Sequence, residues 1–364
     1  MTTQTGSGTA SVEASVVTAL ARRGRWHRGE TAFWGLVILA FLALPSRYLL
    51  INEIAILALF ALSLDLVLGY AGIVSLGHAA FLGWGAYVAG LLTKHGVPDP
   101  TLGLVLCGAS AAALGFATSF VVLRGSDLTR LMVTLGVALV LGEIANQMPS
   151  LTGGADGLQG VAPGPVLGLF GFDIFGRTAC IYSLAVLLAM FLLARRIVNS
   201  PFGLSLRSIR DNPLRAAAIG IPVGRRLVAI YTVAAAYAGI AGALLAQTTQ
   251  FVSLDVFDFS RSADVLLVLI IGGTGYLYGG LIGAAAFRVM QDGFSAITPQ
   301  HWQFWIGLVL VTLVLVRRDR LVHAWRYGFG AIAARVGIDI GRAELGKAEL
   351  GKAKATMPSS GASP

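Results

Sequence analysis

The sequence has 364 residues, of which 56% are apolar and only 12% are Asp, Glu, Lys or Arg. Soluble domains carry about 25% charged residues, so this composition nearly excludes a water-soluble globule. The net charge of +9 does not indicate nucleic-acid binding, because the basic residues lie between apolar runs and not on one soluble face. We expect an all-α, polytopic transmembrane helical bundle that contacts the lipid bilayer and binds no nucleic acid.

Apolar runs recur along the chain, and a helix needs about 20 residues to cross a bilayer. The runs predict about ten spans, several of them short enough to be broken or tilted. The predicted spans are 31–45, 48–69, 80–93, 101–123, 131–148, 179–194, 227–249, 262–273, 276–291 and 302–316. Residues 1–30 are predicted to form an N-terminal tail, residues 31–316 the transmembrane domain, and residues 317–364 a largely disordered C-terminal tail.

The distribution of Lys and Arg predicts the orientation of these spans. With the N-terminus inside, the inner segments 1–30, 124–130, 195–226 and 317–364 hold 4, 2, 7 and 9 Lys or Arg residues. They contain 22 of the 27 in the chain, which is the asymmetry of the positive-inside rule. Both termini are therefore predicted to be cytoplasmic, in a multi-pass protein of the cell membrane.

Glycines and polar groups interrupt the chain between the second and third predicted spans. Glycines recur through residues 69–85, and Ser75, Gly77 and His78 lie at or near membrane depth. Glycine weakens a continuous helix and lets backbones approach closely, so one interpretation is a packing seam with a hydrogen-bonded histidine. The other is a broken helix that lines a translocation pathway and offers free N–H groups at its amino terminus to an anionic substrate.

Ionisable and amide side chains within the spans are further pathway candidates. Glu53 and Glu143 lie near outer span ends and could simply reach the membrane interface. Asp65 lies deeper, where an uncompensated carboxylate is costly, so a partner or water access is expected. The predicted pathway residues are Asn52, Glu53, Asp65, Ser75, Gly77, His78, Glu143, Asn146, Thr152, Gly153 and Gly154.

A set of glycines near the C-terminal end of the domain predicts close helix packing. Gly275, Gly279 and Gly283 recur every fourth residue, so a helix would carry all three on one face. We interpret this face as a packing surface between spans.

The inner loop 199–226 has the strongest pattern in the sequence. Ser200-Pro201 predicts a helix start, Asn212-Pro213 a turn, and Gly220 with Pro222 a helix end. Such a projecting element suits docking against a soluble partner, and a solvated basic loop kept for topology is the alternative. The predicted contact residues are Arg207, Arg210, Asp211, Asn212, Arg215, Ala216, Ala217 and Gly220.

Taken in order, these motifs resemble the membrane permeases of branched-chain amino acid ABC importers. The resemblance covers about residues 50 to 290 and depends on the stretches 69–81, 123–136, 151–158, 200–220, 238–244 and 272–275. Ile73 stands where the family has Gln, Gly280 where it has Pro, and Asp65 where it more often has Asn. These departures bear on the substrate more than on the fold.

The resemblance implies transport of branched-chain amino acids or related small solutes, without catalysis by this chain. It also implies a second related permease subunit, two ABC ATPase subunits that carry ATP and magnesium, and an extracytoplasmic solute-binding protein at a bacterial inner membrane. No cofactor is expected in this chain, since its tail lacks the Ser or Thr of a phosphate-binding loop after Lys347 and Lys352.

The segment 215–220 is similar to the coupling motif of ABC importer permeases, although Arg215 stands where that motif has Glu. Its position among the spans resembles the ten-helix arrangement of vitamin B12 and iron-siderophore permeases. Two alternatives remain: a permease of the same family for urea or amides, and a proton-coupled secondary transporter that uses Asp65, His78 or Glu143.

Overall fold

The computed structural model of the protein describes residues 28–173 and 175–315. One compact unit ends at Gln300 and another begins at His301. The only helix described in the second unit is α14 (Trp302–Leu315). Most of the predicted N-terminal tail and all of the predicted C-terminal tail lie outside the described residues. The prediction that both termini are cytoplasmic also concerns residues outside the described part of the chain.

The helices of the first unit follow the apolar runs predicted from the sequence. They are α2 (Arg28–Ala43), η1 (Pro45–Arg47), α3 (Tyr48–Asp65), η2 (Leu66–Tyr70), α4 (Ala79–Lys94), α5 (Pro100–Val122), α6 (Asp127–Gln147), α7 (Pro149–Thr152), η3 (Gly154–Asp156), α8 (Arg177–Val198), α9 (Pro201–Asp211), α10 (Pro213–Ala218), α11 (Val223–Thr249), η4 (Leu254–Phe257), α12 (Phe259–Gly272) and α13 (Leu277–Ile297). In the described part of the chain, extended pairing is limited to isolated bridges such as Leu158 with Val252. The all-α prediction is confirmed.

The number of membrane spans is only partly fixed by the helices. Among the described residues, five segments are long and apolar enough to cross a membrane: Pro45–Tyr70, α5, α6, α8 and α11. The pair α12 and α13 is a sixth candidate, bent by 112° at a short break, while α2 and α14 are shorter apolar helices. These helices fit a polytopic bundle, and the count of ten spans stays a prediction.

The core of the first unit surrounds α3 and α11. Of the most apolar 18 residues in each segment, 72% are buried in Pro45–Tyr70 and 67% in α11, compared with 17% in α6. Small residues bring α11 close to its neighbours: Gly239 contacts Ala111 of α5, and Gly242 contacts the Leu82 backbone of α4. Without side chains between them the backbones approach closely, which is the usual basis of helix packing in membranes.

Helices α12 and α13 form a bent pair joined by residues 273–276. Gly279 and Gly283 of α13 press against the α12 backbone at Gly272 and Val268, which confirms the predicted packing face. Gly275 does not belong to that face, because α13 begins only at Leu277. It lies in the link with φ +79°, a conformation that favours glycine.

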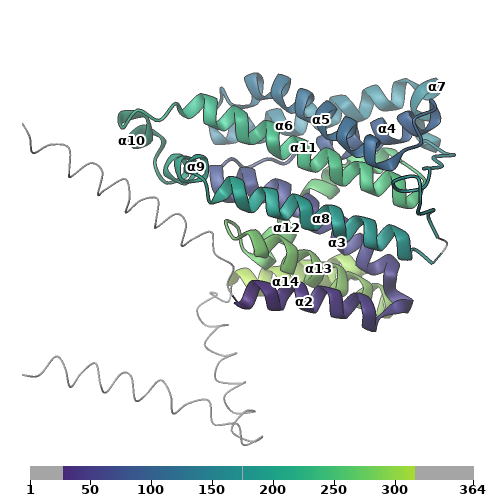
Figure 1. Ribbon diagram of the computed structural model, residues 1–364. Coiled ribbons are helices and arrows are strands. Elements are labelled where there is room, and N and C mark those ends of the chain that lie inside the picture. The colour runs from purple at the N-terminus through teal and green to yellow at the C-terminus, as the bar shows by residue number, and fades with distance from the viewer. Residues whose placement is uncertain (1–27, 174, 316–364) are drawn as a thin grey trace, which may run out of the picture. The chain divides into compact units, whose positions relative to one another are not determined.

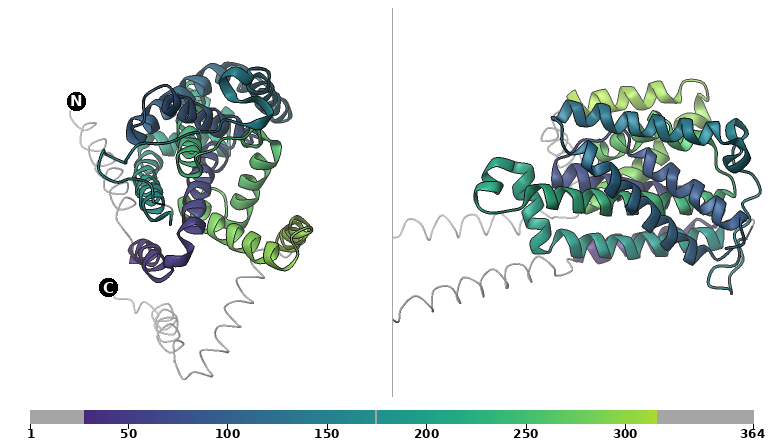
Figure 2. Two further views of the ribbon diagram at one scale, coloured as in Figure 1. Left: turned by 90° about the vertical axis from the view of Figure 1, so that its right-hand side faces the viewer. Right: turned by 90° about the horizontal axis from the view of Figure 1, so that it is seen from above.

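Helices α9 and α10 project beyond the ends of their neighbouring helices, on the left of Figure 1 and in the right-hand view of Figure 2. We call this end of the first unit the α9 end. Helix α7 lies at the opposite end (Figure 1).

Candidate functional site

The helix–turn–helix predicted over residues 200–220 is present. Pro201 occupies the first turn of α9, where its missing N–H costs nothing. The Asn212 side chain then caps α10 by accepting the Arg215 N–H at 2.9 Å. Gly220 has φ +87° and follows the end of α10, as predicted. The Ser200 hydroxyl donates to the Ile197 carbonyl and does not cap α9.

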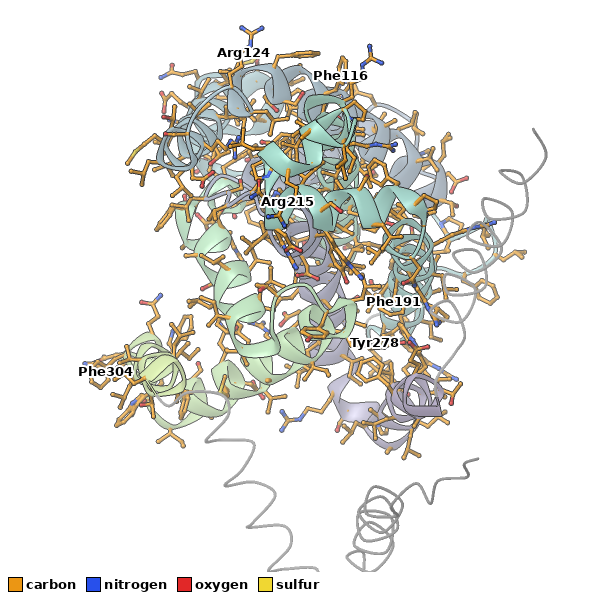
Figure 3. All side chains as sticks on the ribbon, turned by 90° about the vertical axis from the view of Figure 1, so that its left-hand side faces the viewer. Phe116, Arg124, Phe191, Arg215, Tyr278 and Phe304 are labelled. Atoms are coloured by element: carbon orange, nitrogen blue, oxygen red, sulfur yellow. The ribbon has the colours of Figure 1, made fainter. Side chains whose placement is uncertain are left out.

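The short helix α10 and the residue that follows it expose apolar side chains that were not among the predicted contact residues. Leu214 is 83% exposed and Ile219 is 70% exposed, while Ala216 between them is buried and holds α10 against the fold. Arg215, also on α10, lies at the α9 end that faces the viewer in Figure 3. Leu214 and Ile219 therefore make this projecting element a candidate contact surface for a partner.

Arg210 connects α9 to η2, at the end of the apolar segment Pro45–Tyr70. Its guanidinium donates to the Gly69 carbonyl in η2 at 2.5 Å and also pairs with the neighbouring Asp211 carboxylate at 3.3 Å. Its aliphatic stem lies against Gly72, which has φ +75° at the start of the helix break. A charge-assisted hydrogen bond therefore joins α9 to the η2 backbone.

Asp65 is fully buried and connects the same region to the α12–α13 link. One carboxylate oxygen accepts the Gly275 N–H at 2.7 Å, and Arg210 is close enough to attract the charge. Gly69 packs directly beside Gly275, leaving no room for a side chain. The expected partner of Asp65 is thus a backbone N–H from a segment 210 residues away in the sequence.

The predicted break between the second and third spans is present over residues 71–78. Its backbone is held by two hydroxyl groups: Thr134 of α6 accepts the Leu76 N–H at 3.3 Å, and Ser262 of α12 accepts the Ala79 N–H at 3.0 Å. The break is mostly buried in protein, which is how irregular backbone is tolerated at membrane depth.

The N–H groups at the start of α4 are occupied in this structure, which differs from the second of the two interpretations of this stretch. The Ala79 N–H is taken by Ser262, and the next two N–H groups, of Ala80 and Phe81, donate to the carbonyls of Gly77 and His78. Gly77 itself backs onto the Thr134 backbone. In this conformation the amino terminus of α4 therefore has no vacant donor among these residues for an anionic substrate.

His78 is packed as a core side chain. Its Nε2 lies 2.9 Å from the Ser63 hydroxyl, and its ring stacks on Phe60 with centroids 5.6 Å apart. Phe81 contacts the same ring edge-on. This arrangement fits the interpretation of a hydrogen-bonded histidine in a packing seam, and the role of His78 in a pathway stays a prediction.

The remaining pathway candidates lie toward the opposite end. Asn52 is buried, and Glu53 forms an ion pair with Arg288 of α13. Glu143 and Asn146 are exposed on α6, and Glu143 accepts a hydrogen bond from Gln147 at 2.7 Å.

The loop after α6 is held by hydrogen bonds from the Thr152 side chain to the nearby backbone. The buried Thr152 hydroxyl donates to the carbonyls of Ala145 and Met148, so it fixes the turn. Gly153 and Gly154 follow with φ +80° and +57°, which fold the chain back toward Gly157.

The structure brings together candidates that the sequence analysis placed in separate groups. Arg210, predicted as a coupling residue, and Asp65, predicted as a pathway residue, meet at Gly69 and Gly275. The proton-relay candidates are not joined: Asp65 comes two residues after Ser63, the partner of His78, and so projects from another side of α3.

The comparisons with known proteins place the chain in a family of permeases. The sequence model of the family described as branched-chain amino acid transport system, permease component, matches residues 48–316, and the chain belongs to this family. Among its relatives is the high-affinity branched-chain amino acid transport system permease protein LivM of Escherichia coli, 28% identical over 289 residues, covering 74% of this chain and 68% of LivM.

Other relatives carry different names. The fructose import permease protein FrcC of Rhizobium meliloti is 27% identical, and the match covers 76% of this chain and 78% of FrcC. The ribose import permease protein RbsC of Bacillus subtilis is also 27% identical, and the match covers 74% of this chain and 83% of RbsC. No solved structure matches the chain, so the resemblance to the vitamin B12 permease fold stays a prediction.

The family and the apolar helices together define the class of protein. The chain is a multi-pass membrane protein and a permease of the ABC transporter class, whose relatives are transport components and not enzymes.

Proposed function

We propose that this chain is a subunit of a binding-protein-dependent ABC importer in a bacterial inner membrane and forms half of a pathway for branched-chain amino acids. A second related permease would supply the other half, two ATPase subunits would bind ATP and magnesium, and an extracytoplasmic protein would deliver the solute. In this proposal the α9 end is cytoplasmic, in line with the positive-inside distribution of Arg and Lys.

The observation that carries this proposal is the connection made by α9 and α10. Leu214 and Ile219 are exposed for a partner, while Arg210 of α9 holds the Gly69 carbonyl at the start of the helix break. Closure of the ATPases on ATP would move α9 as a lever. The break at 71–78 and the 273–276 link would then shift between two arrangements, driven by different contacts in each state.

The substrate is proposed from the relatives and from the apolar character of the bundle. LivM belongs by name to a branched-chain amino acid system, whereas FrcC and RbsC are named for sugars. An aliphatic side chain suits an apolar pathway wall. Since the N–H groups of Ala79, Ala80 and Phe81 are occupied, the substrate carboxylate would need donors that become free in another state or lie on the second permease.

The test uses the complex purified from its native membrane through a tag on this chain and reconstituted into vesicles. We expect radiolabelled leucine to enter when the binding protein is outside and ATP is supplied to the ATPases, with ribose, fructose and urea as parallel cargoes. Preferred uptake of one of those three would replace the amino-acid assignment. Leucine uptake by this chain alone, driven by an imposed proton gradient, would instead support the secondary-transporter alternative.

A further inference from the structure

An open cavity of about 560 Å³ lies at the α9 end, next to the coupling connection. Helix α9, the end of α8, the start of α2 and the segment that leads into α13 form its wall. Its lining residues are Glu30, Tyr70, Arg195, Val198, Asn199, Arg207, Arg210, Thr274, Gly275, Tyr276, Leu277 and Tyr278.

The cavity has an excess of positive charge. Three arginines line it against one carboxylate, Glu30, which is paired with Arg195 at 2.9 Å. Arg210 is held by Gly69 and Asp211. Arg207 forms no ion pair within residues 28–173 and 175–315, and its guanidinium lies over the Tyr70 ring, 5.2 Å from the ring centre. The half-buried Arg207 is thus a fixed cation without a protein anion.

The chemistry around Arg207 fits a phosphate group. A guanidinium presents N–H groups in a fork that matches phosphate oxygens, and such charge-assisted hydrogen bonds are strong. Thr274 and Asn199 add neutral donors to the same wall, and Tyr276 adds a phenol.

The surroundings of the cavity favour a lipid as the source of that phosphate. Helix α2 borders the cavity at Glu30, and its later turns expose the apolar side chains of Leu36, Ile38, Leu39 and Leu42. Tyr276 is 71% exposed, as is common for tyrosine at the membrane interface. In the proposed orientation the α9 end faces the cytoplasmic leaflet, whose anionic lipids attract basic sites.

We propose that this cavity binds the phosphate headgroup of an anionic phospholipid of the cytoplasmic leaflet, with Arg207 as its principal contact and the acyl chains along α2. This inference rests on the orientation given in the proposed function. A bound headgroup would join α9 to η2 and to the link before α13, the same segments that Arg210 and Asp65 connect, so lipid occupancy would stabilise this arrangement.

The test measures bound lipid by native mass spectrometry of the purified complex after incubation with phosphatidylglycerol or phosphatidylcholine. We expect the natural sequence to retain phosphatidylglycerol in preference to phosphatidylcholine. Arg207→Gln should retain about fivefold less phosphatidylglycerol, the effect of removing one arginine near an anionic lipid. Arg207→Lys keeps the charge and should retain most of it. Arg196→Gln is the matched control, because Arg196 is exposed at the same end of α8 but does not line the cavity.

Two further measurements on the natural sequence distinguish a lipid headgroup from free phosphate, so that the test does not depend on the Arg207 variants alone. Excess inorganic phosphate at matched ionic strength should leave phosphatidylglycerol bound, and displacement would indicate a free-anion site and overturn the lipid assignment. Added sodium chloride should release phosphatidylglycerol from the natural sequence. Equal retention by Arg207→Gln and the natural sequence, or equal retention of the two lipids, would also overturn it. Since no step requires uptake, failure of the importer proposal would be seen separately.

Discussion

At the scale of single residues, the contact between Gly69 and Gly275 determines how η2 meets the α12–α13 link. A Cβ atom at Gly69 would overlap the Asp65 carboxylate and the Gly275 backbone nitrogen, and the backbone cannot yield as a flexible side chain would. The Asp65 hydrogen bond and the position of the Gly69 carbonyl therefore both depend on the absence of a side chain at this residue.

We expect Gly69→Ala to lower the free energy of unfolding by about 1–3 kcal/mol, the usual cost of forcing extra atoms into a packed site. The measurement is the thermal unfolding midpoint of the purified protein in detergent. Gly224→Ala is the control, because Gly224 lies in α11 with open space around its Cα and alanine favours a helix. Equal midpoints for Gly69→Ala and the natural sequence would show that this contact is not as tight as described.

At the scale of elements, α10 is the part of the first unit best suited to a soluble partner. Its capping by Asn212 and the buried Ala216 fix its position, while Leu214 and Ile219 contact little of the fold. Removing those two side chains should therefore leave the permease folded and weaken only the contact with its partner.

We expect the double variant Leu214→Ser, Ile219→Ser to reach the membrane in normal amounts but to lose at least about tenfold in ATPase binding, since burying a leucine or isoleucine side chain contributes about 1.5–3 kcal/mol. The measurement is the amount of ATPase subunit that purifies with the tagged permease. Leu128→Ser is the control, because this leucine is 73% exposed at the start of α6 and is not among the residues predicted to contact the ATPase. Unchanged ATPase recovery would remove α10 from the interface.

Local patterns in the sequence predicted the elements well. Apolar runs placed the helices, and Pro201, Asn212-Pro213 and Gly220 placed the start, turn and end of the projecting element. These features depend on residues a few positions apart, where backbone preferences and hydropathy act directly.

Local patterns could not predict the tertiary contacts, because these join residues far apart in the sequence. The Arg210 bond to Gly69 joins residues 141 apart, and the Asp65 bond to Gly275 joins residues 210 apart. The hydroxyls of Thr134 and Ser262, which occupy backbone donors around the break, come from α6 and α12. The same glycines and polar residues fit both a packing seam and an open helix terminus. Only the residues that lie next to them in space distinguish these two arrangements.

At the scale of the whole molecule, the connection from α10 through α9 to the helix breaks is the central claim. Exposed apolar residues lie at one end of this connection, and buried, irregular backbone lies at the other. Such a connection lets an ATPase outside the membrane bias the arrangement of segments within it, provided that the two states differ in their contacts.

The most direct measurement is the number of ATP molecules hydrolysed per solute molecule imported by the reconstituted complex. We expect Arg210→Gln to raise this ratio about tenfold or more, because it removes a charge-assisted hydrogen bond of about 1.5–3 kcal/mol between α9 and Gly69. Arg225→Gln removes an exposed arginine at the start of α11 and should leave the ratio unchanged. A ratio in Arg210→Gln equal to that of the natural sequence would contradict the claim that α9 drives the helix breaks.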